Sequence, residues 1–272
     1  MDMTSLLTRF LSSVEILREL GEDDEDFFVE YHRLTDEVDD CMDEGRHISI
    51  RDVLNFCAEN EIELNPDEIR SVYADSFYRY ERGAAEMMLM GQMTLVEGMK
   101  ERNILLSQRE LDFIKSTVPE ISRILFVGGG PLPMTPLTYI VNDRNIQVDI
   151  LDKSSEAVEL SKGLIKKVGA APRVHVLPAS PIEDFVPESY DVIVLASMVG
   201  LTIDEKTSIY QQLASHVIRG QTIITRDIDP QSFASLCYCP FPIDQLSEFY
   251  VNVQSQKSDP PVIVSEVMLK RR

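Results

Sequence analysis

The sequence predicts a two-domain protein, with an all-α N-terminal domain over residues 1–118 and an α/β domain over residues 119–272. Two observations support this division. In the first part, apolar residues recur every three or four positions, which is typical of amphipathic helices. In the second part, short apolar runs alternate with helical stretches, which is typical of a parallel sheet with helices on both faces. We therefore expect an α/β fold with a parallel-rich sheet, preceded by helices.

The helices of the first part carry local start signals. Ser49 and Asp52 form a capping-box-like pair at the start of one helix. Asn65 and Pro66 start the next helix, with Asn as the cap and Pro at the first helical position. The apolar face of that helix consists of Ile69, Tyr73, Phe77, Tyr80, Ala84 and Met88. A last helix is expected over residues 105–118.

The strands of the second part are predicted where apolar runs lie between turn signals. They are Arg123–Val127, Val148–Leu151, Val174–Leu177, Val192–Leu195, Thr222–Thr225 and Val262–Val267. Helical patterns separate the earlier strands, at Ser155–Val168 and at Glu205–Val217. The segment Gln254–Pro261 is rich in polar residues and proline, so it is expected to be a connection before the last strand.

The net charge of −20 limits the partners of the protein. The acidic excess lies mostly in residues 1–118, which hold 28 acids and 12 bases. Such a field repels nucleic acids and anionic membranes, so neither is expected as a partner. It attracts a cationic ligand, although solubility is the simpler explanation for the acidic runs at Glu22–Asp26 and Asp36–Glu44.

Neither a membrane span nor a secretion signal is predicted. No apolar run approaches the ~20 residues that a membrane-spanning helix needs. The first 20 residues have the pattern of an amphipathic helix and lack the features of a signal peptide, so a cytoplasmic location is expected. The cysteines form no CxxC pair and no zinc-ligand pattern with histidine, which favours reduced structural thiols and no metal site. They are Cys41, Cys57, Cys237 and Cys239.

A glycine-rich turn follows the first buried strand. It consists of Gly128, Gly129, Gly130, Pro131 and Leu132, with a helix expected to start near Thr135. Glycine lets the chain turn tightly and lets a ligand approach the backbone closely. The prolines depart from the dinucleotide fingerprint, so a ligand without a pyrophosphate, such as S-adenosylmethionine, fits better. We expect a side chain at Gly128 to fill ligand space and abolish binding. The alternative is a tight loop between strand and helix.

Asp152 ends the second strand, 22 residues after Gly130. A carboxylate there can accept both hydrogen bonds from a ribose diol, and about 20 residues is the spacing expected for that role. The alternative is an acid that caps the helix starting at Ser154. Ligands of open α/β sheets bind at the carboxyl ends of strands, so two further strand ends complete the expected site. Their residues are Ser180, Ala196 and Ser197. Together these features predict a Rossmann-like, S-adenosylmethionine-binding domain.

Three segments resemble the nicotianamine synthase family. They are FVGGGPLPMT at residues 126–135, YDVIVLASMVG at residues 190–200 with Lys206 beyond, and Arg226 followed by Cys237-Tyr238-Cys239-Pro240. The family pattern is an FxGxGPLPxT turn, a YDVxxxAAxVG strand, then an Arg and a terminal Tyr-x-Pro, and the resemblance covers residues 65–242. It implies an enzyme that consumes S-adenosylmethionine. Such an enzyme transfers the 3-amino-3-carboxypropyl (2-aminobutanoyl) group to an amine and releases 5′-methylthioadenosine.

The resemblance also places Glu81 at the family's catalytic glutamate. The incoming amine must be neutral, so Glu81 is expected to hold or remove its proton. Glu81 lies beside Tyr80 on a helix with an apolar face, where partial burial would raise its pKa into a useful range. Without the resemblance, the simpler interpretation is a surface acid paired with Arg79 or Arg82.

Three residues are expected to contact the substrate. Arg226 stands at a strand end and can bind a carboxylate through its planar guanidinium. The alternative is an ion pair with Asp227 or Asp229. Tyr80 is expected to bind the substrate. Tyr238 is expected to orient it, and the alternative for Tyr238 is packing alone.

Departures from the plant enzymes favour a bacterial branch of the family. Plant members carry an aromatic-rich FPYxxNY segment before the glycine strand, whereas residues 98–105 contain no aromatic residue and the chain has no long C-terminal extension. Both features are similar to the branch that makes staphylopine- and pseudopaline-type metallophores. That likeness implies one aminobutanoyl unit added to the α-amine of histidine or a similar amino acid, and an opine dehydrogenase acting on the product.

Three other functions fit the same residues. They are a nicotianamine synthase proper, a methyltransferase of the same fold and a non-catalytic binding protein. An exposed helical face would also allow a homodimer.

Overall fold

The computed structural model describes residues 2–21, 24, 26–42, 48–98, 101–182, 190–257 and 264–272. Parts of both acidic runs, of the segment at 98–105 and of the connection before the last strand lie outside them. The chain divides into two compact units. One is Met1–Tyr80 with Ile228–Pro240, and the other is Glu81–Asp227 with Phe241–Arg272. This division differs from the boundary expected at residue 118, and it assigns a late segment of the chain to the helical unit.

Residues 81–118 belong to the second unit because their apolar side chains pack there. Helix α4 (Pro66–Met90) carries Ala85 and Met88, which pack in one cluster with Leu132 of the glycine turn. Helix α6 (Glu101–Thr117) carries Leu111 and Ile114, which pack against the sheet. The spacing of apolar residues identifies these segments as helices, but it does not show which hydrophobic core their apolar faces join.

The first unit is helical. It contains α1 (Met3–Glu19), α2 (Phe27–Cys41), α3 (Ile50–Glu59), the start of α4 and the short 3-10 helix η2 (Phe233–Leu236). The predicted start signals are confirmed: Ser49 and Asp52 form a capping box on α3, and Asn65 Oδ1 accepts a hydrogen bond from Asp67 N at 3.1 Å. Arg70 on α4 donates to Ser235 O at 2.6 Å, which ties the late segment into the helical unit.

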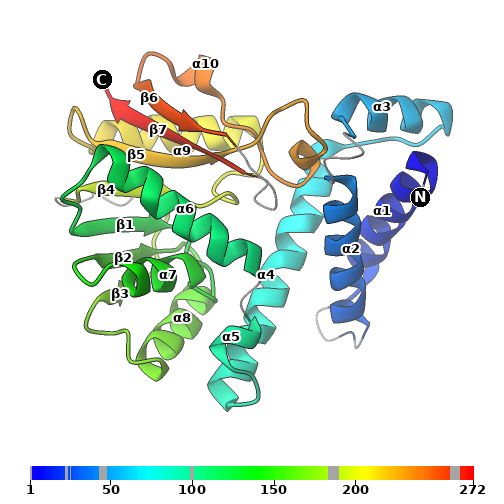
Figure 1. The fold of residues 1–272 in the computed structure, drawn as a ribbon. Coiled ribbons are helices and arrows are strands. Elements are labelled where there is room, and N and C mark those ends of the chain that lie inside the picture. The colour runs from blue at the N-terminus through cyan, green and yellow to red at the C-terminus, as the bar shows by residue number, and fades with distance from the viewer. Residues whose placement is uncertain are drawn as a thin grey trace. The chain divides into compact units, whose positions relative to one another are not determined.

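The second unit is built on a mixed, mostly parallel sheet. Over the described residues it has seven strands in the order β3-β2-β1-β4-β5-β7-β6. The strands are β1 (Arg123–Val127), β2 (Gln147–Leu151), β3 (Val174–Val176), β4 (Val192–Leu195), β5 (Thr222–Asp227), β6 (Tyr250–Gln256) and β7 (Ser265–Arg271). Strands β1 to β5 are mutually parallel, and β7 is antiparallel to both of its neighbours (Figure 1). The predicted fold class is thus confirmed.

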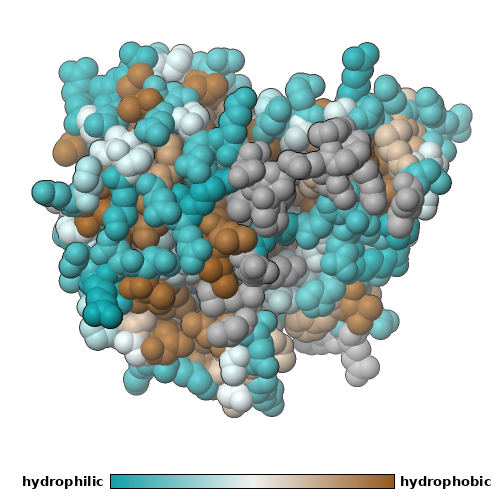
Figure 2. All heavy atoms as spheres, in the orientation of Figure 1, coloured by the Kyte–Doolittle hydropathy of each residue, from teal (hydrophilic) through white to brown (hydrophobic). Residues whose placement is uncertain are grey.

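Helices cover both faces of this sheet. They are α6, α7 (Met134–Asn142) and α8 (Ser155–Lys167) on one face, and α9 (Ile203–His216) and α10 (Ile243–Leu246) on the other. Alternate residues of β1 explain the two layers, because Ile124 and Phe126 pack under the first set and Leu125 and Val127 under the second. Hydrophilic residues cover most of the face seen in Figure 2, with separate hydrophobic patches between them.

Strand β6 was not predicted. Val251 and Val253 alternate with Asn252 and Gln254, but this pattern is short. All residues from Val251 to Ser255 are exposed in the structure, so the strand buries no alternating apolar face. It forms because it pairs with β7 along one side, with a register shift between Asn252 and Gln254. The expected connection at 254–261 therefore begins later than predicted, after Gln256.

Within the described ranges, none of the helices is both long and apolar enough to cross a membrane. The same residues bring together no group of three His, Cys, Asp or Glu side chains that would hold a metal ion. All four cysteines are buried thiols rather than disulfides, as predicted.

Candidate functional site

The candidate site lies at the carboxyl ends of β1, β2 and β4, where the glycine turn leaves the sheet. Gly128 N donates to Leu151 O at 2.8 Å, and Ala196 N donates to Val127 O at 3.0 Å. These bonds tie the start of the turn to the strands on both sides of β1. Because strand order reverses across β1 and β4, this is the switch point at which open α/β sheets bind ligands.

Backbone conformation and packing require the glycines. Gly128 and Gly130 have φ of 79° and 64°, a region that favours glycine. A Cβ at Gly128 would lie 2.7 Å from Val199 Cγ2, and a Cβ at Gly129 would collide with the side chain of Ile150. A side chain at Gly128 would thus meet the protein's own loop after β4, and the expectation that it also fills ligand space stays a prediction.

Asp152 joins the turn to helix α8. Its Oδ2 accepts a hydrogen bond from Gly130 N at 2.9 Å, and its Oδ1 accepts one from Ser154 N at 2.9 Å. The cap of α8 is Ser154 itself, whose side chain accepts from Ala157 N. A carboxylate has about four acceptor positions, so two remain for a ligand. Asp152 thus has a local role at the start of α8, as the alternative interpretation held. It also keeps hydrogen-bond acceptor positions for a ribose diol.

The other predicted cofactor residues differ in what they contact. Ser180 N donates to Asp152 O at 3.0 Å, so the loop after β3 reaches the same strand end. Ala196 and Ser197 are partly exposed after β4. Pro131 and Leu132, by contrast, are buried, and Leu132 packs against α4. Leu132 therefore has a packing role, and a cofactor contact by either residue stays a prediction.

Glu81 lies against the glycine turn, in the same unit as Asp152. A Cβ built on Gly130 would be 2.7 Å from Glu81 Oε2, so the carboxylate sits over the α-carbon of this glycine. Burial, and the negative charge of nearby Asp152, raise the pKa of Glu81 well above its ordinary value. Two carboxylates from distant parts of the chain thus face one turn.

The end of α4 holds Glu81 in place. After Glu81 the helix packs through Ala84 and Met88 on the turn and on α8. Gly163 of α8 lets the Leu89 side chain approach closely, with Leu89 Cδ2 3.1 Å from a Cβ built at Gly163. Lys167 Nζ donates to Leu89 O at 2.9 Å near the end of α4.

The arginines proposed as partners of Glu81 are engaged elsewhere. Arg82 Nη1 lies 3.9 Å from Glu156 Oε1. Arg79 donates to the carbonyls of Leu20 and Gly21, where it ties α4 to the end of α1. The interpretation of Glu81 as a surface acid therefore finds no support.

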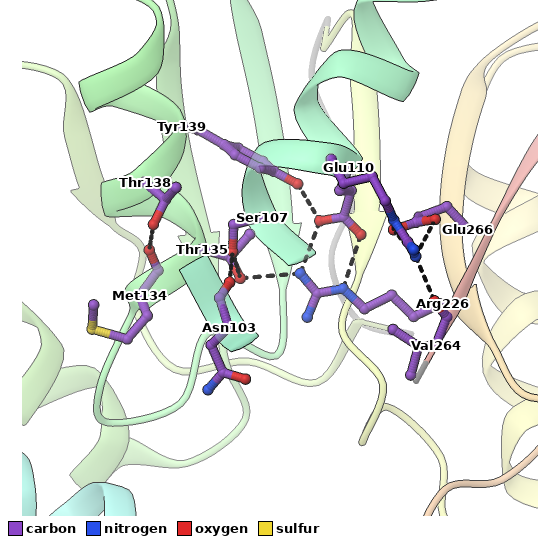
Figure 3. A network of polar contacts seen from close by, with 11 residues as sticks. Asn103, Ser107, Glu110, Met134, Thr135, Thr138, Tyr139, Arg226, Val264 and Glu266 are labelled. Atoms are coloured by element: carbon purple, nitrogen blue, oxygen red, sulfur yellow. Dashed lines mark hydrogen bonds and ion pairs between the residues drawn. The ribbon is translucent and has the colours of Figure 1, made fainter. Parts of the chain in front are cut away.

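Arg226 makes a buried ion pair inside the second unit. Its Nε and Nη2 each donate to Glu110 of α6 at 2.8 Å, and Nη2 also donates to Thr135 Oγ1 at 3.0 Å (Figure 3). The Glu110 side chain has no exposed surface and accepts a further hydrogen bond from Tyr139. The expected role in binding substrate is thus not supported. The alternative of an ion pair is correct in kind, but the partner is neither Asp227 nor Asp229.

Tyr80 and Tyr238 lie in the helical unit. The Tyr80 ring stacks on Tyr31 with centroids 4.7 Å apart. The Tyr238 hydroxyl is 3.2 Å from the hydroxyl of Tyr73, which sequence reasoning assigned only to the apolar face of its helix. Burial raises the pKa of Tyr73 well above its ordinary value. Their contact with substrate stays a prediction.

Comparison with known proteins identifies the family. The sequence profile described as "Nicotianamine synthase protein" matches residues 101–272, which is more than half of the chain. The protein belongs to the nicotianamine synthase family. The match includes the glycine turn, Asp152 and Arg226, whereas Glu81 and Tyr80 lie before it.

Curated members of the nicotianamine synthase family match over part of their length. Nicotianamine synthase 1 of Hordeum vulgare is 31% identical over 137 residues, which are 47% of this chain and 41% of that protein. Nicotianamine synthase 2 of Oryza sativa subsp. japonica is 30% identical over 128 residues, or 44% and 39%. The aligned part thus spans less than half of these relatives.

Solved structures of similar fold cover nearly the whole chain. MtNAS in complex with MTA and tNA aligns with a TM-score of 0.75 at 17% identity, over 98% of this chain and 97% of that one. A mutant of MtNAS in complex with S-adenosylmethionine gives 0.72 at 16%, over 97% of each. The S-adenosylmethionine-dependent methyltransferase SibL gives 0.52 at 15%, over 98% and 96%. At these identities the likeness shows the fold.

Sequence reasoning missed the partners that determine what each site residue can do. Glu110 is the partner of Arg226, and Gly130 is the contact of Glu81. The signal for Glu110 is weak: one acid on the inner face of an amphipathic helix. For Gly130 the sequence shows a glycine in a turn, but not which side chain approaches it.

Proposed function

We propose that the protein transfers the 3-amino-3-carboxypropyl group of S-adenosylmethionine to an amine and releases 5′-methylthioadenosine. The observation that carries this proposal is the Glu81 carboxylate, held at the glycine turn beside Asp152. A methyltransferase needs the turn and the strand-end acid, whereas a base at this place suits an incoming amine. Membership of the nicotianamine synthase family supports the same reaction.

The donor set fits S-adenosylmethionine as a substrate. Asp152 has acceptor capacity for a ribose diol, and the two carboxylates at the turn complement a positively charged sulfonium. Ala196 and Ser197 are small and partly exposed at the adjacent strand end, so they leave room for a ligand. These residues bind and orient the substrate.

Glu81 handles the proton of the reaction. The amine nitrogen attacks the γ-carbon of the methionine arm, the C–S bond breaks, and its electron pair stays on sulfur, which becomes a neutral thioether. The nitrogen gains a positive charge and passes one proton to Glu81. A raised pKa makes ionised Glu81 a stronger base than an ordinary glutamate, and the positive sulfonium favours that ionised form.

The acceptor we propose is the α-amine of histidine or a similar amino acid, with one unit added. The absence of aromatic residues at positions 98–105 supports this choice, because the plant enzymes carry an aromatic-rich segment there. The product would then be consumed by an opine dehydrogenase in the synthesis of a metallophore. Substrate contacts by Tyr80 and Tyr238 belong to the same proposal.

Nicotianamine synthesis proper is the second candidate. The curated relatives at 30–31% identity are nicotianamine synthases. Such an enzyme forms its product from S-adenosylmethionine alone, so it needs no added amino acid.

Product analysis tests the proposal and separates the candidates. Purified protein is incubated with S-adenosylmethionine, with and without L- or D-histidine, and the products are identified by mass spectrometry. Methylthioadenosine with a histidine adduct carrying one aminobutanoyl unit is the expected result. Methylthioadenosine with a cofactor-only oligomer would establish nicotianamine synthesis. S-adenosylhomocysteine would mean methyl transfer, and no turnover would refute the proposal that the protein is an enzyme.

The role of Glu81 has a matched control on the same helix. Glu81→Gln is expected to leave S-adenosylmethionine binding intact and to lower kcat by about 100-fold or more, because it removes a base without changing shape. Glu86→Gln makes the same change at an exposed position of α4 and should leave kcat unchanged. Equal losses of binding and turnover in Glu81→Gln would make Glu81 a structural residue instead.

A further inference from the structure

We propose that Gly130 is a positioning residue for Glu81, because the space that a side chain would take at Gly130 is the space that the Glu81 carboxylate fills. The role of the Glu81 carboxylate as a base rests on the proposed function, whereas its close approach to Gly130 does not. The familiar reason for a glycine in such a turn is close approach of a ligand to the backbone. Here the approaching group belongs to the protein.

The geometry at Gly130 joins both carboxylates. A Cβ on this residue would lie 2.7 Å from Glu81 Oε2 and 3.9 Å from Glu81 Cδ. The first distance is shorter than a van der Waals contact between carbon and oxygen. The backbone N–H of the same residue donates to Asp152 Oδ2 at 2.9 Å. Gly130 therefore leaves the space beside its α-carbon to the Glu81 carboxylate and binds Asp152 through its nitrogen.

The carboxylate is the part that would yield to a side chain at Gly130. The turn is fixed at one end by the hydrogen bond from Gly128 N to Leu151 O, and at the other by burial of Leu132. The helix that carries Glu81 is fixed by Ala85 and its neighbours. Glu81 is bound to this frame through rotatable bonds, so Gly130→Ala is expected to turn its carboxylate away from Asp152.

Positive φ is a competing reason for glycine at this position, and the chain offers a control for it. Gly130 has φ 64° and Gly169 has φ 73°. A Cβ at Gly169 would meet nothing within 4 Å. Gly169→Ala therefore imposes the same kind of backbone strain without the collision.

The decisive measurement is the titration of the Glu81 carboxyl carbon, followed by NMR in protein labelled with ¹³C at the glutamate carboxyls. Glu81→Gln assigns the signal by its loss. Moving the carboxylate away from Asp152 and toward solvent lowers its pKa, so the midpoint in Gly130→Ala should shift to lower pH. In Gly169→Ala it should stay where it is in the wild type. An unchanged midpoint in Gly130→Ala would overturn the inference.

A second variant decides the case in which Gly130→Ala does not fold. Glu81→Ala removes the colliding carboxylate, so Gly130→Ala combined with Glu81→Ala should fold, with a Tm loss no larger than that of Gly169→Ala. If the combined variant also fails to fold, the glycine is required by conformation alone and the inference is wrong.

Turnover separates this inference from the proposed function. In an active enzyme, Gly130→Ala should lower kcat about 100-fold, keep the Kd for S-adenosylmethionine within about threefold, and add little loss to Glu81→Gln. A raised Kd with unchanged kcat would instead make Gly130 a ligand-approach residue. If the wild type releases no methylthioadenosine, the proposed function fails, but the titration still tests the contact.

Discussion

Arg226→Met is expected to destabilise the protein strongly and to leave substrate affinity unchanged. The guanidinium donates twice to Glu110 at 2.8 Å and once to Thr135, and only 9% of its side chain is exposed. Methionine keeps much of the length and removes the charge. The variant would leave the carboxylate of Glu110 buried, with Tyr139 as its remaining hydrogen-bond donor in this network.

The size of the effect follows from burial. Removing one partner of a buried ion pair costs about 3–5 kcal/mol, because the other charge stays out of water without compensation. For a cooperative unit of this size, 1 kcal/mol corresponds to about 2–4 °C in Tm. A loss of about 6–20 °C is therefore expected in thermal melts of Arg226→Met.

Two further variants make the assay specific. Lys162→Gln removes an exposed ion pair with Glu159 and should change Tm by about 2 °C or less. Adding Glu110→Gln to Arg226→Met removes the stranded charge and should recover a clear part of the loss. The contrary result is a small change in Tm with a raised KM for the acceptor. It would show that Arg226 binds substrate, and the reasoning from the buried pair would be wrong.

Three more predictions use other groups of the second unit. Gly128→Ala is expected to lower Tm by about 5–10 °C, because the positive φ strains an alanine and its Cβ would collide with Val199 Cγ2. Adding Val199→Ala should recover part of the loss in thermal melts if the collision contributes. Since the pKa of Glu81 is raised, kcat/KM should rise with pH above the ordinary range of glutamate, and a pH–rate profile of Glu81→Gln that keeps this rise would contradict its role as base. Burial raises the pKa of Glu266 from 4.5 to about 7 despite its ion pair with Arg109, so its contribution to stability is full below pH 4.5 and lost by about pH 7. Urea unfolding should show a flatter decline over this range in Glu266→Gln, and an equal decline in both proteins would refute the assignment.

Local signals explain which parts of the fold could be predicted. Strands β1 and β4 begin and end where expected, because strands buried on both faces appear as unbroken apolar runs. The starts of α3 and α4 were predicted because the cap residues lie within a few positions of the helix. Strand β6 has only a short alternation, Val251 and Val253 with polar residues between and after them, and this side stays exposed; its stability comes from pairing with β7.

The residues of the candidate site also differ in whether local sequence signals predict their place. The turn and Asp152 were predicted together because a βαβ unit fixes their spacing, and the hydrogen bond from Gly130 N to Asp152 is the result. Arg226 of β5 could not be placed by local reasoning, because its partner Glu110 lies 116 positions away on helix α6. A polar residue at a strand end looks the same in sequence whether it faces a ligand or a buried carboxylate.

The raised pKa of Glu81 is at once a cost to folding and a condition of the proposed chemistry. A group whose pKa is higher in the folded state contributes stability below its unfolded pKa and loses it as the pH rises. Holding Glu81 beside Asp152 therefore weakens the fold at neutral pH. The two arginines next to it in sequence make contacts elsewhere, Arg79 with Leu20 and Arg82 with Glu156. Packing of Ala84 and Met88 on the glycine turn offsets this loss of folding stability. In the proposed chemistry, the positive sulfonium of the substrate favours the ionised form of Glu81. An arginine beside Glu81 would keep its carboxylate ionised, and weakly basic, even without substrate.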